Sequence, residues 1–421
     1  MATITTSVAE TCAAAKWASQ VLATLGSGVK DAGLNAVADA LVDRAEAILE
    51  ANRLDLEAGR EAGLTPALLD RLALDEPRIA AIGTGVRKIA ALPDPVGEVI
   101  EGFRLPNGLD VRKVRVPLGV VAVVYEARPN VTIDAAALCL KSGNAIVLRG
   151  SSSAAHSNAA LAFVASQAAT NAGLPDGALS LVGGGGREEL AELATQTGIV
   201  DLIVPRGGEG LKAALKGVAT VPVMYAASGN CHVYVDASAD LEAAEAIVLN
   251  AKLQRPGVCN AAETLLVHAD VADAFLPSAL AALSEAGVRL HGDDRARVAA
   301  PRVPVDPASD EDWDTEYLAL ELAVGVVDSV TDAIAHVNAH GSGHSEAIVT
   351  SDTISARAFE LGVDAACVYV NASTRFTDGG EFGMGAEIGN STQKLHARGP
   401  IGIRELCTFK YLVEGTGQIR P

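Results

Sequence analysis

The stretch VVAVVYEARPNVTIDAAALCLKSGNAIVLRG, residues 120–150, contains two short β-rich runs with a helical pattern between them. The runs are VVAVVY and AIVLRG, and the helical segment IDAAALCLK separates them. The alternation continues to residue 215 through AALAFVASQAA, ALSLVG, REELAELA, DLIVP and EGLKAAL. Strands and helices that alternate at this spacing predict a parallel sheet covered by helices on both faces.

Two further regions extend this α/β pattern. Residues 7–92 carry alanine-rich segments with apolar side chains at three- and four-residue intervals, which predict a helical N-terminal layer. A second strand–helix alternation begins at CHVYVD (231–236) and ends at CVYV (367–370). The sequence therefore predicts an α/β fold with two α/β units in series.

A β-hairpin is predicted at residues 96–116, where two β-rich runs flank Asn107-Gly108, a strong hairpin signal. Near the C-terminus, CTFKYLVEG (407–415) has the pattern of a strand but no evident sheet of its own. Unpaired strand edges invite association, so the hairpin and this strand predict a homo-oligomer.

Composition limits the class of protein. The chain has 421 residues, of which 49% are hydrophobic and 20% charged, typical of a globular protein with two or three domains. Its 52 acidic and 33 basic residues give a formal charge of −19, which disfavours nucleic-acid binding. No apolar run is long enough for a bilayer and no secretory pattern opens the sequence, so we expect a cytoplasmic protein without membrane contact.

The six cysteines contain no CxxC pair, which disfavours both a disulfide framework and a zinc site. Cys259 differs from the others because it lies in QRPGVCN (254–260), a polar turn between a helix and a strand. An accessible thiol near an arginine could act as a nucleophile, although buried filler is the commoner role of a cysteine. The local sequence leaves both interpretations open.

Other polar clusters are ambiguous. His336, His340 and His344 have a spacing of four, but glycines interrupt the helix and no acidic partner has a suitable spacing, so a structural role is favoured over metal binding. The tail contains four cationic or histidine side chains that fit interface pairing and anion binding equally well; they are Arg375, Lys394, His396 and Arg398.

Two glycine-rich turns follow predicted strands and precede helices, a topology that can present N–H groups to a phosphate. Residues 183–186 are four glycines, and a plain tight turn is the favoured interpretation there. PRGGEG (205–210) adds an arginine, so a phosphate site and a plain turn are evenly balanced.

Taken together, these segments resemble the γ-glutamyl phosphate reductases, a branch of the aldehyde dehydrogenase superfamily. The resemblance covers nearly the whole chain, includes the histidine-rich string, and rests on PLGVVAVVYEARPNVTIDAAALCLKSGNAIVLRG (117–150), DLIVPRGGEGL (201–211), NAKLQRPGVCNAAETLLVH (250–268), DAIAHVNAHGSGHSEAI (332–348) and YVNASTRFTDGGEFGMGAEIGNSTQKLHARGPIGI (369–403).

The resemblance implies an aldehyde dehydrogenase-like fold with three parts. They are a Rossmann-like NADP-binding domain at 1–99 and 118–228, a catalytic domain at 229–377, and an oligomerisation element with a tail at 100–117 and 378–421. It also implies the reaction: NADPH-dependent reduction of L-glutamate 5-phosphate to L-glutamate 5-semialdehyde with release of phosphate, in proline biosynthesis. Functional coupling to glutamate 5-kinase, which makes the labile acyl phosphate, would fit this pathway.

By the same resemblance, Cys259 matches the nucleophile that forms a thioester, and Asn130 matches the side-chain donor to the oxyanion. Glu316, in a shorter match, resembles the glutamate that holds the nicotinamide ribose. The position of the general-base glutamate of aldehyde-oxidising relatives is Ala226 here, which fits a reductase because its thioester need not meet activated water.

The cofactor expected from the resemblance is NADP(H). NAD-using relatives carry a glutamate in the adenosine-ribose loop, where it binds the ribose hydroxyls and repels a 2′-phosphate, whereas this loop has hydroxyls and a cation. Its expected cofactor ligands are Arg149, Ser151 and Ser152, and Arg149 is the expected partner of the 2′-phosphate. Gly207 and Gly208 are the expected ligands in the second glycine-rich turn. No metal is expected.

Three cations are candidates for the substrate phosphate: Arg255, Arg375 and Lys394. A semialdehyde dehydrogenase of the same fold that uses phosphate or coenzyme A is the enzyme alternative. A relative kept only as a binding or scaffold protein is the non-enzyme alternative, which the presence of Cys259, Asn130 and Glu316 disfavours.

Overall fold

The computed structural model describes residues 7–183, 186–225 and 229–420. The chain forms two compact units. The first contains Met1–Tyr225, Met384–Gly389 and Ile401–Pro421, and the second contains Ala226–Gly383 and Asn390–Pro400. The C-terminal region is therefore divided between the two units.

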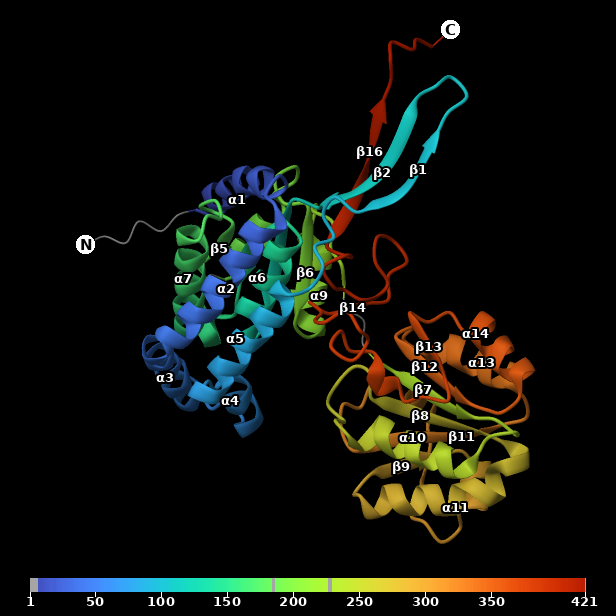
Figure 1. The fold of residues 1–421 in the computed structure, drawn as a ribbon. Helices are drawn as coiled ribbons and strands as arrows, with labels where there is room; N and C mark the ends of the chain where they lie inside the picture. Colours follow the sequence, from blue (N-terminus) through green and yellow to red (C-terminus); the bar gives the residue numbers. More distant parts are fainter. Residues whose placement is uncertain (1–6, 184–185, 226–228, 421) are drawn as a thin grey trace. The chain divides into compact units, whose positions relative to one another are not determined.

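The first unit begins with a layer of five helices (Figure 1), as the alanine-rich pattern predicts. Side-chain caps fix several of their starts: Ser7 accepts from the Glu10 N–H, and Thr65 and Asp75 accept in the same way at α4 and α5. Residues at helical spacing, such as Leu34, are buried against the rest of the unit. The helices are α1 (Val8–Leu22), α2 (Ser27–Asp43), α3 (Ala45–Glu61), α4 (Pro66–Leu72) and α5 (Glu76–Ala90).

A parallel sheet of four strands follows, in the order β5-β4-β3-β6. Its central strand, β3, is fully buried, which explains its unbroken apolar sequence. The strands are β3 (Val120–Tyr125), β4 (Ala145–Arg149), β5 (Leu179–Leu181) and β6 (Leu202–Arg206). The connecting helices are α6 (Asn130–Lys141), η1 (Ser152–Ala154), α7 (Ala155–Asn171), α8 (Arg187–Ala194) and α9 (Glu209–Val218). The strand order reverses between β3 and β6, where α/β proteins commonly bind ligands.

The predicted hairpin forms an antiparallel arm of β1 (Val99–Arg104) and β2 (Asp110–Pro117). The C-terminal strand β16 (Cys407–Glu414) pairs with β2 in the same chain (Figure 1). The strand therefore has a sheet partner that its own pattern did not reveal, in the hairpin with which the resemblance groups it. Local pattern identified the strand, but its partner lies nearly 300 residues earlier, beyond the reach of periodicity.

The second unit contains a seven-stranded sheet in the order β10-β9-β11-β8-β7-β12-β13, and all its pairs are parallel. Both predicted parallel sheets are thus present. The strands are β7 (Cys231–Val235), β8 (Ala262–His268), β9 (Arg289–Gly292), β10 (Asp306–Pro307), β11 (Glu321–Val327), β12 (Ser345–Val349) and β13 (Cys367–Val370).

Helices cover both faces of this sheet. One apolar core, which includes Phe275 and Leu280, joins one face to α10–α12, and a second, which includes Tyr234 and Phe359, joins the other face to α13 and α14. The helices are α10 (Leu241–Leu253), α11 (Ala269–Glu285), α12 (Asp294–Ala299), η2 (Asp310–Asp314), α13 (Val330–His340), α14 (Thr353–Gly362) and η3 (Thr374–Phe376). A short ladder of β14 (Asn390–Ser391) and β15 (Gly399–Pro400) completes the unit.

Among the helices that the structure describes, none is both long enough and apolar enough to cross a membrane.

Candidate active site

Cys259 lies in the turn between the end of α10 and the start of β8, as its polar sequence context predicts. All six cysteines are among the described residues; five are buried and Cys259 alone is partly exposed. Burial raises the pKa of buried thiols such as Cys12, to about 11, and disfavours their thiolates. Accessibility therefore separates Cys259 from the other five as a nucleophile.

Gly229 lies directly against the backbone of Cys259. A Cβ at position 229 would lie 1.6 Å from the Cys259 carbonyl oxygen and 2.5 Å from its Cα, so only glycine fits there. The same carbonyl oxygen accepts a hydrogen bond from the Cys231 Sγ at 3.2 Å. The Gly229 N–H donates to Oε1 of Glu316 at 2.6 Å, which brings Glu316 next to the segment that packs on Cys259.

The other side of the cysteine turn is held by the segment around η3. The Asn260 side-chain amide donates to the Thr377 carbonyl oxygen at 2.9 Å, and the Thr374 hydroxyl donates to the Asn260 carbonyl oxygen at 2.7 Å. Both bonds are buried, so they fix the backbone next to Cys259.

Two of the three predicted phosphate ligands lie near Cys259. Arg375 donates from Nε to Gln254 Oε1 at 2.8 Å, at the end of α10. Burial lowers the pKa of Arg375; Asp378 opposes this, the positive charge of Arg255 adds to it, and Cys259 also acts on the guanidinium. Arg375 therefore lies within electrostatic range of Arg255 and Cys259, and Asp378 offsets part of the positive charge there.

Lys394, the third candidate, is placed differently. Its ammonium pairs with Asp364 at 2.6 Å, and Arg398 pairs with the same carboxylate at 2.9 Å. These side chains line a pocket of about 480 Å³ with Glu346, whose carboxyl is buried. The structure thus joins Lys394 to Asp364 and Arg398 rather than to Arg255 and Arg375.

A buried ion pair supports the turn that carries Glu316. Lys252 Nζ lies 2.5 Å from Glu263 Oε2, and neither side chain is exposed. Burial raises the pKa of Glu263 to about 7 and lowers the pKa of Lys252. Glu263 Oε1 accepts from the Leu318 N–H at 3.2 Å, and Leu318 has a φ of 53°, which only such a fixed turn sustains in a leucine. Sequence reasoning missed this pair because its residues lie in apolar-looking helix and strand patterns.

In the first unit, the second glycine-rich turn lies where the strand order reverses. Tyr125 of β3 is paired with Arg206 of β6, and Glu126 continues beside Gly207 and Gly208. The Gly208 N–H, at the start of α9, donates to Glu126 Oε2 at 3.0 Å. A Cβ on Gly207 would lie 2.7 Å from that carboxylate oxygen. The turn thus presents an N–H donor to an oxyanion and needs glycine for its close approach.

The predicted ribose loop follows β4. Arg149 is the last residue of that strand, Ser151 Oγ accepts from the Ala127 N–H at 3.1 Å, and Ser152 is exposed at the start of η1. Arg149 also has an acidic neighbour that sequence reasoning missed, because its Nε lies 3.2 Å from Glu189 Oε1 of α8. No local pattern connects these two residues.

Asn130 is the first residue of α6, and its side-chain amide donates to Asp134 Oδ2 at 2.9 Å, one helical turn later. Burial raises the pKa of Asp134 to about 6; the hydrogen bond from Asn130 opposes this shift. Asp134 therefore fixes the orientation of the Asn130 amide, and sequence reasoning did not identify it.

Comparison with known proteins identifies the family to which these features belong. The sequence matches the aldehyde dehydrogenase family over residues 3–301. The chain belongs to the aldehyde dehydrogenase family. Within this family it is 57% identical to the γ-glutamyl phosphate reductase of Moorella thermoacetica over 406 residues, 96% of this chain and 97% of that protein.

Two further relatives agree. The γ-glutamyl phosphate reductase of Thermobifida fusca is 57% identical over 399 residues, which is 95% of each chain. The crystal structure of the γ-glutamyl phosphate reductase of Thermotoga maritima superposes with a TM-score of 0.96 at 44% identity, covering 98% of this chain and 100% of that one. The predicted membership of this branch and the predicted aldehyde dehydrogenase-like fold are confirmed.

Membership of the aldehyde dehydrogenase family implies a nicotinamide cofactor. In the first unit, the turn at the start of α9 has the Gly208 N–H as a donor for a cofactor phosphate, and in this structure the Glu126 carboxylate accepts from that N–H and lies against Gly207. Arg149 and the serine hydroxyls at the end of β4 provide groups that could bind an adenosine ribose.

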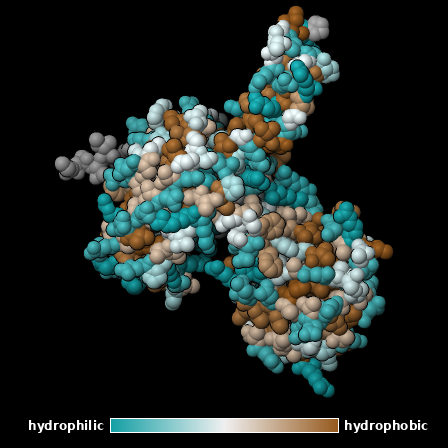
Figure 2. All heavy atoms as spheres, viewed as in Figure 1, coloured by the Kyte–Doolittle hydropathy of each residue, from teal (hydrophilic) through white to brown (hydrophobic). Residues whose placement is uncertain are grey.

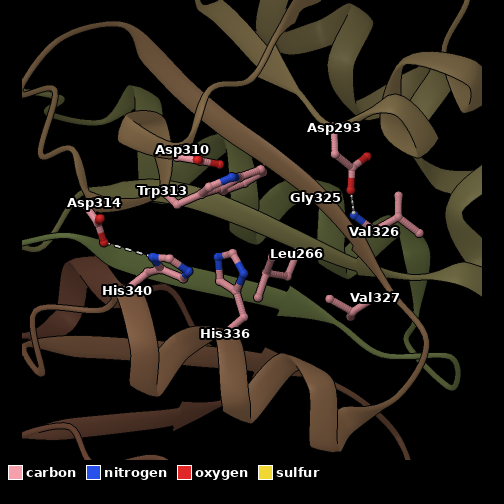
Figure 3. Close-up of a pocket in the computed structure, with 10 residues that line it drawn as sticks. All are labelled: Leu266, Asp293, Asp310, Trp313, Asp314, Gly325, Val326, Val327, His336 and His340. Atoms are coloured by element: carbon pink, nitrogen blue, oxygen red, sulfur yellow. Dashed lines mark hydrogen bonds and ion pairs between the residues drawn. The ribbon is translucent and has the colours of Figure 1, made fainter.

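The histidines of the family string face inward in this aldehyde dehydrogenase. Figure 3 shows His336 and His340 of α13 opposite Trp313, with the His340 Nδ1 2.9 Å from Asp314 Oδ1. The His336 ring is edge-on to Trp313, with 5.2 Å between the centroids, and burial lowers its pKa to about 3. These residues line a pocket of about 430 Å³. Among the described residues no group of three or more His, Cys, Asp or Glu side chains could hold a metal ion.

Two predicted features lie outside the described residues: Ala226, at the general-base position, and Gly184–Gly185, in the middle of the four-glycine turn.

Proposed function

We propose that this aldehyde dehydrogenase reduces L-glutamate 5-phosphate to L-glutamate 5-semialdehyde and releases phosphate, as a step of proline biosynthesis. Nearly full-length identity to proteins with the name γ-glutamyl phosphate reductase supports this substrate and direction. The structural observation that carries the proposal is the Cys259 turn, which contains the one partly exposed thiol among six cysteines.

The chemistry follows from that thiol. The Cys259 sulfur attacks the acyl phosphate carbonyl, the bond from carbon to the phosphate oxygen breaks, and phosphate leaves with the electron pair. The thiol proton passes to solvent, and an acyl thioester remains on Cys259. When bound, NADPH supplies the hydride that reduces this thioester. Cys259 then leaves as a thiolate and the semialdehyde is released.

Two arginines support phosphate departure. Arg255 and Arg375 act on each other electrostatically next to Cys259, so we assign them to the substrate phosphate, whose one to two negative charges need such compensation. Lys394 remains a candidate only if its pair with Asp364 opens. The buried bonds of Asn260 keep the cysteine turn fixed while charge develops.

Asn130 stays a prediction as the donor to the substrate carbonyl oxygen. Its amide has two hydrogens, and the bond to Asp134 uses one of them, which would leave the other oriented for a developing oxyanion. Glu316 likewise stays a prediction as the ligand of the nicotinamide ribose.

We also propose NADPH as the preferred nucleotide, since β4 ends in a cation, Arg149, and serine hydroxyls follow it. Its proposed ligands are Arg149, Ser151, Ser152, Gly207 and Gly208. A cytoplasmic location and coupling to glutamate 5-kinase stay predictions from the sequence.

We propose that the chain forms a homo-oligomer through the arm, meaning the three-stranded sheet of β1, β2 and β16. Among the described residues, β1 and β16 are the outer strands of their three-stranded sheet. Phe409, Tyr411 and Val413 alternate along β16, share one face and are about half exposed. Figure 2 shows hydrophobic atoms along this arm. A second copy of the chain would cover them, because exposed apolar strands favour association.

The test uses the reverse reaction. With glutamate semialdehyde and NADP⁺, NADPH should accumulate in the presence of inorganic phosphate and slow strongly without it, because the thioester needs phosphate as acceptor. Rapid steady oxidation in phosphate-free buffer would contradict the proposal and indicate a hydrolytic aldehyde dehydrogenase. Dependence on coenzyme A instead of phosphate would also contradict it.

A further inference from the structure

Arg149 is bound by a carboxylate from a different element. Its Nε lies 3.2 Å from Glu189 Oε1, and its Nη2 donates to the Gly186 carbonyl oxygen at 3.0 Å. Both contacts involve the first turn of α8, which Gly186 caps. Only 12% of the Arg149 side chain and 19% of the Glu189 side chain are exposed, so this pair is less screened than an ordinary surface pair.

This arrangement changes what the ribose loop offers to a nucleotide. The loop itself has no acidic residue, which favours NADPH. Glu189 nevertheless brings a carboxylate to the cation expected to bind the 2′-phosphate.

We propose that Glu189 is a specificity-determining residue that limits the preference of this enzyme for NADPH over NADH. The proposal rests on the proposed use of NADP(H) and on Arg149 as the contact of the 2′-phosphate. Glu189 neutralises part of the Arg149 charge and repels a 2′-phosphate bound to the same guanidinium. NADH carries hydroxyls there, which can donate to a carboxylate, so its binding does not suffer this repulsion.

The charge of Glu189 sets the expected direction of the change in NADPH affinity. A 2′-phosphate carries between one and two negative charges near neutral pH, and it would lie within a few ångströms of the Glu189 carboxylate, where like charges repel each other. Removal of the Glu189 charge should therefore tighten NADPH binding by about tenfold. Binding of NADH should change by less than about twofold.

The experiment measures nucleotide binding directly. Glu189→Gln in the full-length protein keeps the shape of the side chain and removes its charge, and Glu189→Ala is a second variant with the same expected direction. Glu188→Gln is the matched control: it removes one charge from the same turn of α8, and Glu188 is exposed. Dissociation constants for NADPH and NADH come from nucleotide fluorescence, and 2′,5′-ADP competes as a probe of the 2′-phosphate alone.

The proposal predicts that Glu189→Gln tightens NADPH and 2′,5′-ADP by about tenfold, while Glu188→Gln changes the ratio of NADPH to NADH affinity by less than twofold. A ratio unchanged in both Glu189 variants, or weaker NADPH binding in both, would overturn it. The latter result would mean that Glu189 positions Arg149 for the phosphate. Failure of the proposed function is a separate result, because it would remove activity with glutamate 5-phosphate and leave the nucleotide affinities measurable.

Discussion

Gly229→Ala tests the packing on which the proposed nucleophile depends. The added Cβ would lie 1.6 Å from the Cys259 carbonyl oxygen, 2.3 Å from its carbonyl carbon and 2.5 Å from its Cα. All three are backbone atoms, so no side-chain rotation relieves the contact. Because carbon and oxygen atoms normally stay at least about 3 Å apart, residues 229 and 259 must separate by more than about 1 Å.

The expected cost has two parts. A displacement of about 1 Å at a reacting group costs roughly 100-fold in rate, or about 2.7 kcal/mol of transition-state stabilisation. Overpacking of this kind also lowers the free energy of unfolding by about 1–3 kcal/mol, which a folded protein with a stability of about 5–15 kcal/mol survives. The Gly229 N–H bond to Glu316 would lengthen as well.

The assay compares Gly229→Ala with Gly257→Ala. Gly257 lies in the same turn as Cys259, but a Cβ there meets only the Leu318 carbonyl oxygen at 3.6 Å, an ordinary contact. We expect kcat for NADPH oxidation with glutamate 5-phosphate to fall about 100-fold in Gly229→Ala and less than threefold in Gly257→Ala. Alkylation of Cys259 by iodoacetamide gives a second readout. Gly229→Ala protein with near-normal kcat, alkylation and unfolding free energy would refute the close approach.

Three further predictions follow from the described residues. Cys259→Ser should abolish reduction and preserve NADPH binding, and substantial turnover by the serine variant would exclude the thioester. In the unmodified protein, iodoacetamide should label Cys259 before the buried Cys139 and Cys367, as peptide mass spectrometry can show. Burial lowers the pKa of His344 from 6.5 to about 4. Between pH 6.5 and pH 4 the unfolded chain therefore binds a proton that the folded chain does not, so the protein becomes less stable as the pH is lowered through this range. His344→Gln should therefore lose about 2 kcal/mol less unfolding free energy than the unmodified protein between pH 7 and pH 5 in urea titrations, and an equal loss would contradict this. Light scattering should find a homo-oligomer at micromolar concentration that Phe409→Asp weakens, whereas a monomer of the unmodified chain would rule out the arm as an interface.

The sequence predicted those features that depend on neighbours along the chain. Periodicity identified the buried strand β3 and the helices after it, because a strand covered on both faces reads as a continuous apolar run. Asn107-Gly108 identified the hairpin, since Gly108 has a φ of 90° that its turn requires. The polar turn around Cys259 separated that thiol from five buried ones.

What the sequence could not predict depends on contacts between distant segments. Two such contacts are the pairing of β16 with β2 and the buried ion pair of Lys252 with Glu263. In both, the local sequence pattern of each element does not indicate which distant segment it contacts. Lys394 was a reasonable phosphate ligand by charge alone, but its pair with Asp364 is set by tertiary structure. A list of cations therefore overstates the positive charge that a site offers.

Several candidate site groups already have partners within the chain. Glu126 accepts the Gly208 N–H, Asp134 accepts from Asn130, Glu189 pairs with Arg149 and Glu316 accepts from Gly229. In each case a carboxylate of the chain itself lies within 3.2 Å of the donor or cation. A phosphate-bearing ligand must replace some of these internal contacts. Its binding free energy is therefore the difference between the contacts it makes and the contacts it replaces. If Arg149 binds the 2′-phosphate as proposed, acidic residues opposite such donors help to set which phosphates bind, and removal of the single charge of Glu189 tests this.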